Sequence, residues 1–545
     1  MLIVFSGAFR YTCFVISICK ERIFLKHSFF RLTAAVLTAV FLFTLTGCGS
    51  SGSNSFTWFV DTIPSNLDPQ VASAASDVIA CENLYSGLVR KNPDGEYEPA
   101  LCERWEKSSD GRTYTFYLKD GLTYTAAKGT ATEYAITAED FVFAFRRMFR
   151  AETASPYAVE FSALENSAAV LAGQMPENAL GVSASGPLTL VFRLSSPDDN
   201  FLEKLTLPGA TPCDEEFFNS TRGTYGLTAA TTLSSGSFYL YNWTSSGLFL
   251  RRASSGSLID SLRLVQNTNN AGQSAAELLA NEKCSAAPDD TGAATSLTSQ
   301  SYSDTTWSLL FNCNSVFAST GLRQALASVA RTAAEVPDPS LYTAASGLVP
   351  EGLTVDGIDY RSEAGDVSPA AVDARALYLS VRQNMSTSDF NKVSLMVPAG
   401  SGMTQAAETI NGVWQKEFSL FFSVEEVDAD TFDQRLADGD YTIALAPIRA
   451  EGGSVYQMLE QFTASGGNLT GYSDALFSTQ LQASAQATGT SRCRLLADCE
   501  RQLLSDAVVV PLFAQQKRLL IANGIHDLIF DPFGPVLDLT YTTKE

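Results

Sequence analysis

Short alternations of hydrophobic and polar residues, closed by Gly, Asn, Asp or Pro, run through the first half of the chain. Residues 113–118 alternate aromatic or aliphatic side chains with polar ones and lead into an Asp-Gly pair, which predicts a half-buried strand and a tight turn. Residues 188–196 repeat the alternation, and residues 236–253 do so twice across a Ser-Ser-Gly turn, which predicts a hairpin.

Two segments of this half have helical periodicity instead. Residues 137–149 open with a Thr-x-x-Asp pattern, a loose capping box followed by a hydrophobic run, which predicts a helix. Residues 76–90 place hydrophobic side chains as far as Leu88 on one face, with Ser76 or Asp77 as the N-cap, and predict a second helix.

Strands and helices alternate at short spacing in the second half, which predicts an α/β lobe with its own sheet. The small polar stretch 290–306 before it predicts a loop or a crossing between lobes. Near the end, residues 491–523 predict a helix that runs into a buried strand at 508–513. Between these limits lie predicted strands at 306–312, 393–398, 421–427 and 441–448 and helices at 321–333, 404–418 and 429–437.

The N-terminal region has the pattern of an export signal. The apolar run Ala34–Leu45 is too short to cross a membrane, follows several cationic residues and ends at Leu-Thr-Gly-Cys, which resembles a bacterial lipobox with Cys48 as the lipidated residue. We therefore expect a signal sequence over 1–47 and a Gly/Ser-rich tether over 48–55. The alternative is an accidental cysteine. The apolar residues ahead of this signal, 1–24, are either a further membrane-inserting segment or the result of a translation start placed too early.

Length, charge and histidine content narrow the function. The 498 residues after position 47 exceed one compact core and predict two or three domains. A net charge of −22 disfavours binding to nucleic acid or anionic lipid. The only histidines are His27, in the signal, and His526, so a His-rich metal site is excluded and a Ser-His-Asp or Cys-His mechanism has one available base. We predict a protein that is not an enzyme and has no cofactor, although a paired-carboxylate enzyme is compatible with this composition.

Seven cysteines follow Cys48, and their spacing contains no Cys-x-x-Cys pair of the kind that binds zinc. Because the number is odd, they cannot all pair with one another. A Cys81–Cys102 disulfide is one possibility, and the other cysteines are expected to be small buried hydrophobic residues.

Several segments, in order, resemble the family 5 solute-binding proteins of ABC importers, the oligopeptide- and dipeptide-binding group. One departure is the Ser-Ser-Gly-Ser-Phe sequence at 234–238, where the family usually has Gly-Thr-Gly-Pro-Tyr. The resemblance covers nearly the whole mature chain. It is carried by "NLDPQ" at 66–70, by residues 83–124, by "ITAEDFVFAFRRM" at 136–148, and by segments 151–161, 180–197, 234–243, 311–330, 471–477 and 506–513.

The resemblance implies an α/β, two-lobed, periplasmic-binding-protein-like clamshell of type II, whose larger lobe is split into two subdomains. Lobe I would comprise 56–305 plus 506–545, with a subdomain inserted at about 82–187, and lobe II would comprise 306–505. The chain would cross the hinge near 306–314 and again near 505–513. The implied protein is a lipid-anchored monomer on the outer face of the cell membrane. It would bind peptide and pass it to an ABC permease and its ATPase.

The resemblance also places a set of residues on the cleft. Each has a plainer interpretation: Tyr157 as a core aromatic residue, Arg435 as a solvated charge on a helix, and Phe513 as part of the core. The implied ligand-binding residues are the loop Ala72–Ser76 with Ala74 and Ala75, and Tyr157, Arg435, Asn468, Thr470, Tyr472 and Phe513.

One expected feature is missing after residue 448. Peptide-binding relatives usually carry a Trp and then an Asp that pairs with the α-ammonium of the peptide, whereas this chain has Arg449 near that position and Glu451 two residues later. Either Glu451 takes the role of the acid, or the ligand is not a free-amino peptide and an anionic ligand is possible; Arg449 could also point to water. A lipoprotein that kept the fold but lost import, acting as a sensor or adhesion module, is a further alternative.

Overall fold

The structure is a computed structural model of the chain, in which Asn54–Glu545 forms one compact unit. Two residues with predicted roles, Cys48 and Glu451, lie outside the part that it describes. The described residues are 54–198, 200–252, 256–270, 272–293, 296–450, 453–534 and 536–545.

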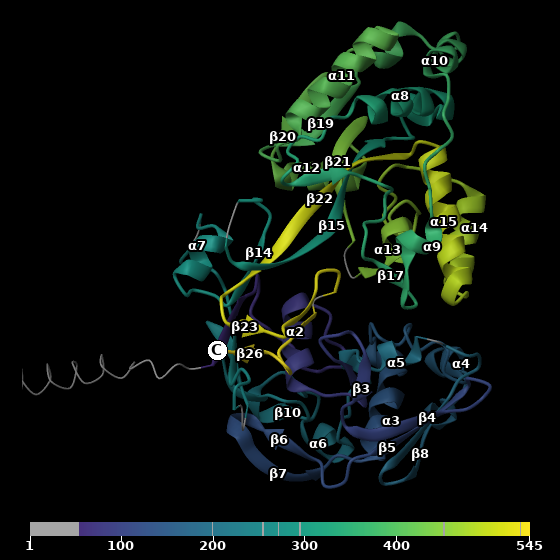
Figure 1. Ribbon diagram of the computed structural model, residues 1–545. Coiled ribbons are helices and arrows are strands. Elements are labelled where there is room, and N and C mark those ends of the chain that lie inside the picture. Colours follow the sequence, from purple (N-terminus) through teal and green to yellow (C-terminus); the bar gives the residue numbers. More distant parts are fainter. Residues whose placement is uncertain are drawn as a thin grey trace, which may run out of the picture. The chain divides into compact units, whose positions relative to one another are not determined.

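A seven-stranded mixed sheet lies at the centre of the C-terminal half (Figure 1). Its order is β14-β22-β15-β21-β19-β20, and β16 also pairs with β22. β15 pairs antiparallel with both β22 and β21, whereas β19 is parallel to both β20 and β21. The strands are β14 (Ala286–Asp289), β15 (Thr298–Phe311), β16 (Tyr342–Ala344), β19 (Ser394–Pro398), β20 (Ser423–Val427), β21 (Ile443–Arg449) and β22 (Val509–Ile521).

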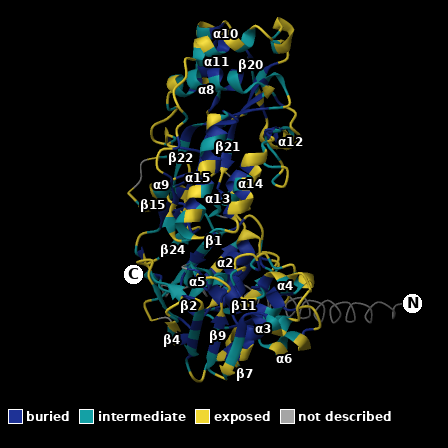
Figure 2. Ribbon diagram, turned by 90° about the vertical axis from the view of Figure 1, so that its right-hand side faces the viewer, coloured by how far each residue is buried: buried dark blue, intermediate teal, exposed yellow. Residues whose placement is uncertain are grey.

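Both faces of this sheet are buried. Along β15, Leu309 and Phe311 belong to one hydrophobic cluster while Leu310 between them belongs to the other. Successive side chains of a strand point to opposite faces, so a strand in a sheet covered on both sides needs hydrophobic residues at consecutive positions. This is why the strands predicted in the second half are continuous hydrophobic runs. Figure 2 colours the chain by burial: β19 and β21 are buried at the centre of the sheet, whereas the first residues of β15 and most of the edge strand β20 are exposed or half-buried.

Helices cover the two faces separately (Figure 1). Trp414 is fully buried on one face, where its indole N–H donates to the carbonyl oxygen of Leu326 at 3.0 Å. On that face lie α8 (Thr320–Ala333), α10 (Ala374–Arg382) and α11 (Thr404–Phe418). On the other lie α9 (Tyr360–Ala364), α12 (Ala429–Asp438), α13 (Val455–Glu460), α14 (Ala475–Ser484) and α15 (Gly489–Ser505).

We call the part of the unit between β15 and β22 lobe II, and the parts before β15 and after β22 lobe I. In lobe I a four-stranded sheet packs on α2 (Ala75–Leu84), in a cluster that also contains Leu519 and Ile521 from the far end of β22. β15 and β22 therefore connect the two lobes. The sheet has the order β1 (Ser55–Phe59), β13 (Ser261–Val265), β12 (Gly247–Arg251) and β11 (Tyr239–Thr244).

A second part of lobe I has its own hydrophobic core around α3 (Ala138–Met148), and the Thr137–Asp140 capping box that begins this helix is present as predicted. The core continues to Leu233, beyond the subdomain limit of 187 that the resemblance suggested, because β9 is hydrogen-bonded between β5 and β8 and β10 pairs with β6. The strands are β4 (Cys102–Lys107), β5 (Thr113–Leu118), β9 (Thr189–Arg193) and β8 (Val182–Gly186), with a smaller sheet of β10 (Leu233–Ser234), β6 (Thr123–Ala126) and β7 (Thr130–Ala135).

A buried ion pair joins two of the motifs that carry the resemblance. The guanidinium of Arg147 on α3 donates to both carboxylate oxygens of Asp68, at 2.6 and 2.7 Å. The side-chain amide of Gln70 in the same motif donates to the carbonyl oxygens of Gly209 and Thr211. These motif residues therefore hold the loop before α2 against the second core of lobe I.

The stretch 290–306 was predicted to be a loop or a crossing between lobes, and from Thr298 onward it is a crossing, because β15 begins there and pairs with β22. Two predictions about the first helix are wrong. The first helix ends at Leu84, so Leu88 is not part of it. Its N-cap is Ala74 rather than Ser76 or Asp77, and the Asp77 carboxylate instead accepts a hydrogen bond from the backbone N–H of Ser65.

No disulfide joins Cys81 to Cys102, since the two lie in different hydrophobic clusters. All seven cysteines of the described residues are free thiols, and all but Cys313 are buried. Among the described residues, no helix is both long and apolar enough to span a bilayer.

Candidate ligand-binding site

A C-terminal hairpin of lobe I lies where three cavities meet. It consists of β24 (Ile529–Asp531), β25 (Val536–Asp538) and the turn between them, in which Pro532 lines all three cavities. The neighbouring Phe533 packs on lobe II, where its side chain lies against Gly352 and Gly453. The hairpin is thus a contact between the lobes in addition to β15 and β22.

The cavity between the lobes, which we call the inter-lobe cavity, has a volume of about 760 Å³. Lobe I contributes residues from the loop before α2, from α2 itself, from the Pro156–Glu160 segment and from the C-terminal hairpin. Lobe II contributes β17 (Thr354–Val355), the start of α13 and side chains of α15. Its lining includes Ala72, Ser73, Glu82, Tyr157, Tyr456 and Arg492.

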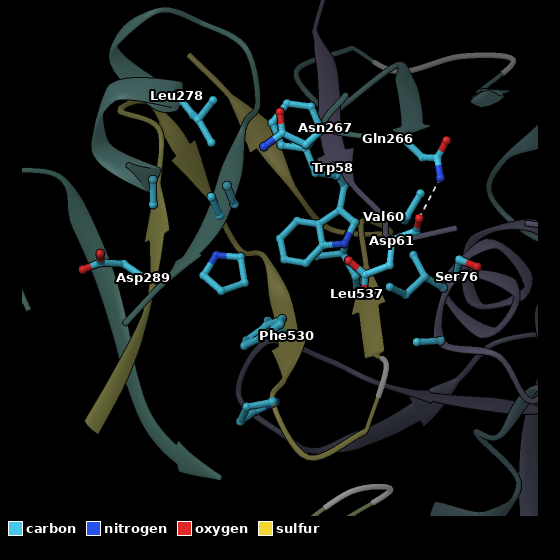
Figure 3. Close-up of a pocket in the computed structure, with 18 of the residues that line it drawn as sticks. Trp58, Val60, Asp61, Ser76, Gln266, Asn267, Leu278, Asp289, Phe530 and Leu537 are labelled. Carbon is cyan, nitrogen blue, oxygen red and sulfur yellow. Dashed lines mark hydrogen bonds between the residues drawn. The ribbon is translucent and has the colours of Figure 1, made fainter. Parts of the chain in front are cut away.

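A second cavity of about 910 Å³ lies between the first sheet of lobe I and α7 (Ala275–Ala280), and we call it the Trp58 cavity (Figure 3). The rings of Trp58 and Phe530 lie 6.1 Å apart on its wall. Gln266 donates a hydrogen bond to the carbonyl oxygen of Asp61 at 2.7 Å across one side. Every charged side chain on its lining is acidic. The third cavity, of about 400 Å³, lies beside β16.

The loop Ala72–Ser76 is divided between two of these cavities. Ala72 and Ser73 line the inter-lobe cavity, whereas Ala75 and Ser76 line the Trp58 cavity. Ala74 lies between them, exposed at the N-cap of α2. This loop therefore contributes to both hollows on either side of the C-terminal hairpin.

Tyr157 lines the inter-lobe cavity and is fixed from two sides. Its hydroxyl donates to the carbonyl oxygen of Ala72 at 2.8 Å, and its ring lies so close to Gly209 that a Cβ there would be 2.6 Å from the ring. Burial, with the nearby Cys81 and Glu82, raises the pKa of Tyr157 far above its usual range. The phenol is thus a neutral, preoriented group on the cavity wall.

The two arginines that suggested an anionic ligand do not line the inter-lobe cavity. Arg435, on α12, is paired with Glu425 (Nη1–Oε1 2.7 Å) and donates to the carbonyl oxygen of Asp440, so its charge is already neutralised within lobe II. Arg449 is exposed at the end of β21, in register with Thr305 of β15. The cationic side chains that do line the cavity are all in ion pairs, so among the described residues no free positive charge supports the hypothesis of an anionic ligand.

Asn468, Thr470 and Tyr472 come together within lobe II rather than at this cavity. The amide of Asn468 donates to the carbonyl oxygen of Tyr472, and the carbonyl oxygen of Thr470 accepts from the backbone of Cys313 at 2.7 Å. The hydroxyl of Tyr472 donates to Asp506 at 2.6 Å. Together these bonds attach the loop before α14 to the ends of β15 and α15.

Phe513 is also remote from the cavity. It is 1% exposed and packs with Trp307 and Tyr342 in the cluster under α8. The plainer interpretation, a core residue, agrees with this position.

The inter-lobe cavity brings in several side chains that the sequence did not single out. Tyr456 and Arg492 come from α13 and α15, and Arg492 is paired with Asp356 at 3.1 Å. Glu82 comes from the last turns of α2 and makes no hydrogen bond or ion pair with any described residue. No local motif marks these residues, because each reaches the cavity only through the packing of elements far apart in the chain.

Burial of the Glu82 carboxyl, followed by repulsion from Asp538 on β25, raises its pKa to about 8. Desolvation disfavours the ionised form of a carboxyl group, and a second acid close by adds to this. Glu82 therefore keeps its proton at neutral pH while the cavity is empty. Among the described residues, no group of three or more His, Cys, Asp or Glu is placed to hold a metal ion.

Comparison with known proteins adds to this geometry. The model of the bacterial extracellular solute-binding proteins, family 5, middle part, matches residues 96–470, which is more than half of the chain. The chain belongs to this family. Its members bind solutes and are not enzymes, so the predicted family and the predicted lack of catalysis are both confirmed.

Curated relatives match over shorter stretches. The chain is 34% identical over 151 residues to the probable deoxycholate-binding periplasmic protein YgiS of Escherichia coli, covering 27% of each chain. It is 28% identical over 180 residues to the periplasmic oligopeptide-binding protein OppA of Salmonella typhimurium, covering 33% of this chain and 32% of that one. These matches therefore span about a third or less of either relative.

Solved structures match over almost the whole chain. OppA of Listeria monocytogenes bound to peptide has a TM-score of 0.64 at 20% identity and covers 91% of this chain and 99% of its own. The substrate-binding domain of an oligopeptide ABC transporter from Bacillus anthracis gives 0.65 at 20% identity, with coverages of 91% and 99%. The predicted α/β fold of a type II periplasmic binding protein is confirmed.

Proposed function

We propose that this protein is the substrate-binding component of an ABC importer, which captures peptides between its lobes and delivers them to a permease. The observation that carries the proposal is the inter-lobe cavity, which residues of both lobes line between the connecting strands β15 and β22 and the C-terminal hairpin. Its volume of about 760 Å³ lies within the range of pockets that enclose small ligands. A short peptide, or part of a longer one, fits this size.

The cavity wall offers backbone partners as well as side chains. In the described part of the chain, β17 pairs only with β18 (Ile358–Asp359), which leaves its second edge without a strand. An extended peptide can add to such an edge through main-chain hydrogen bonds, which are independent of peptide sequence. Tyr157 on the facing lobe provides a fixed hydroxyl whose oxygen can accept a hydrogen bond, so we assign it to peptide contacts. Ala72, whose N–H and carbonyl are both bonded within lobe I, holds this hydroxyl in place.

Closure of the lobes requires a place where β15 and β22 can bend. From Thr305 to Phe311 β15 is also paired with β21, which resists bending there although the pairing with β22 has a second irregularity between Trp307 and Ser308. Just before Thr305, Ser303 and Asp304 of β15 together oppose the single residue Gln516 of β22, a β-bulge. We place the hinge at this bulge, where the Asp304 carboxylate and the Lys517 ammonium lie 2.7 Å apart.

Lipid attachment at Cys48 accounts for the N-terminal sequence and fits this role. A binding protein tied to the outer face of the membrane stays at a high effective concentration beside its permease, with residues 48–55 as the tether. We infer that the protein works as a monomer with a permease and an ATPase. Genes for these two components beside its own gene would support import over a sensor or adhesion role on the same fold.

Thermal denaturation with a ligand panel tests the proposal. A ligand that binds only the native state and is present at a hundred times its dissociation constant stabilises by about 2.7 kcal/mol, so a true peptide ligand should raise the melting temperature measurably. The panel consists of di- to octapeptides, with deoxycholate as a non-peptide anionic probe. Failure of every peptide to raise the melting temperature would refute peptide binding, and a shift with deoxycholate alone would favour the anionic alternative.

A further inference from the structure

Every cationic side chain that lines the inter-lobe cavity already has an acidic partner. Such a pair leaves no free positive charge to attract an acidic ligand group. The three pairs are Lys91–Glu203 (Nζ–Oε1 2.6 Å), Lys204–Asp198 (Nζ–Oδ2 2.7 Å) and Arg492–Asp356 (Nη1–Oδ1 3.1 Å).

Three carboxyl groups on the same wall have no cationic partner among the described residues: Glu82, Glu160 and Asp531. Glu160 and Asp531 are exposed, and Asp531 accepts a hydrogen bond from the backbone of Phe533 at 2.9 Å. Glu82 differs from both, because it is half-buried and no donor in the described part of the chain satisfies it. A half-buried carboxyl without a hydrogen-bond donor costs free energy, and a ligand that supplies a donor can remove this cost.

The groups packed around Glu82 do not compensate its charge. Cys81 on the same helix and Tyr157 on the facing segment are both neutral at pH 7, since burial raises the pKa of each well above its usual range. Asp538 on β25 repels it, and burial raises the pKa of Asp538 as well. Arg90 and Arg252 lower the pKa of Asp538, and neither forms an ion pair with Glu82. Because no cationic side chain in the described ranges pairs with Glu82, we expect a cation beside it to come from a ligand.

We propose that the inter-lobe cavity selects ligands that carry a positive charge, and that the Glu82 carboxylate receives this charge. This inference rests on the proposed function and specifies its substrate class: peptides with an ammonium or guanidinium group. The group can be the α-ammonium of the peptide or the side chain of a lysine or arginine. Both have the same chemistry, a multiple N–H donor with a full positive charge, which forms a short, strong bond with a carboxylate.

Glu82→Gln is the variant that tests the role of the charge. It keeps the shape of the side chain and removes only the ionisable group, while Glu133→Gln on β7 is an exposed control outside the cavity. Binding to wild type and both variants is measured by isothermal titration calorimetry at pH 7. The ligands are tetra-alanine, its N-acetyl form, and N-acetyl peptides with lysine or norleucine at one position, so that the two sources of positive charge are separated.

We expect the charged member of at least one matched pair to bind wild type and Glu133→Gln about tenfold or more tightly than its neutral counterpart. Glu82→Gln should lose this preference and bind the neutral peptides as wild type does. At pH 6.5 the lysine peptide should also displace about one proton from wild type, visible as a buffer-dependent heat, and none from Glu82→Gln. If N-acetylation lowers the affinity of wild type, the α-ammonium is the group that Glu82 binds. If replacing lysine by norleucine lowers it, the lysine side chain is that group.

Two results would overturn the inference while leaving the proposed function intact. One is equal binding of charged and neutral peptides by wild type, and the other is an undiminished preference in Glu82→Gln. If no peptide binds wild type at all, the proposed function falls and the inference falls with it. Thermal unfolding of Glu82→Gln at or above the wild-type temperature at pH 7 excludes misfolding as the cause of any loss.

Discussion

Glu82 makes the stability of the empty protein depend on pH in a way that one substitution should remove. Its carboxyl group has a pKa of about 8 in the folded protein, raised first by burial and then by Asp538, against an ordinary value of 4.5. Between these two values the folded chain keeps a proton that the unfolded chain has lost. The stabilisation by the bound proton is thus complete below pH 4.5 and disappears as the pH rises through 8.

The expected size follows from the shift. One pKa unit corresponds to about 1.4 kcal/mol, so with these two pKa values the free energy of unfolding should fall by about 2.5 kcal/mol from this group between pH 5 and pH 7. Glutamine does not titrate and has no such dependence. The free energy of unfolding of Glu82→Gln, relative to that of wild type, should therefore rise by about 2 to 3 kcal/mol from pH 5 to pH 7. At pH 7 the variant should be the more stable protein.

Urea denaturation followed by circular dichroism at pH 5, 6, 7 and 8 measures this difference for wild type, Glu82→Gln and the exposed control Glu133→Gln. Only the Glu82→Gln curve should be flatter than that of wild type. Parallel pH dependences for wild type and Glu82→Gln, or a Gln variant that is less stable at pH 7, would show that this carboxyl is not desolvated in the folded protein.

Three other substitutions test separate parts of the account. Asp68→Asn should destabilise by about 3 to 5 kcal/mol in urea unfolding, because it leaves the buried Arg147 without its partner, whereas Arg104→Gln in an exposed pair should change little. A wild-type midpoint for Asp68→Asn would refute the role assigned to that pair. Gly209→Ala places a Cβ 2.6 Å from the Tyr157 ring and should weaken peptide affinity, while Gly186→Ala, with open space around it, should not; equal affinities would remove Tyr157 from the site. Cys48→Ala should release the protein from the membrane or leave it unprocessed, and unchanged retention and mass on fractionation would refute the lipid anchor.

Elements with a strong local pattern could be predicted from the sequence. The capping box at Thr137 begins α3 at the expected residue, and the hydrophobic run at 441–448 is a strand covered on both faces. The polar half of β15 could not be predicted in this way, because its Ser, Thr and Gln residues have no alternation. Pairing with β22, about 200 residues later, is what makes this segment a strand.

The site residues also differ in how far the sequence could predict them. Tyr157 could be assigned from a family motif and lines the inter-lobe cavity, whereas the loop before α2 was assigned only in part: Ala72 and Ser73 line this cavity, but Ala74 and Ala75 do not. Arg435 could not, because a motif gives its place on a helix but not the acids that pair with it. Glu82 was missed for a related reason: its environment is created by Asp538, which is more than 450 residues away in the sequence and adjacent only after folding.

The central claim is that one ligand is held by both lobes at once. Hydrogen–deuterium exchange of the full protein, with and without a peptide that raises its melting temperature, tests this claim most directly. We expect slower exchange in four segments together, two in lobe I at 72–82 and 156–160 and two in lobe II at 353–356 and 454–457. Protection confined to one lobe, or found only outside these segments, would contradict the account.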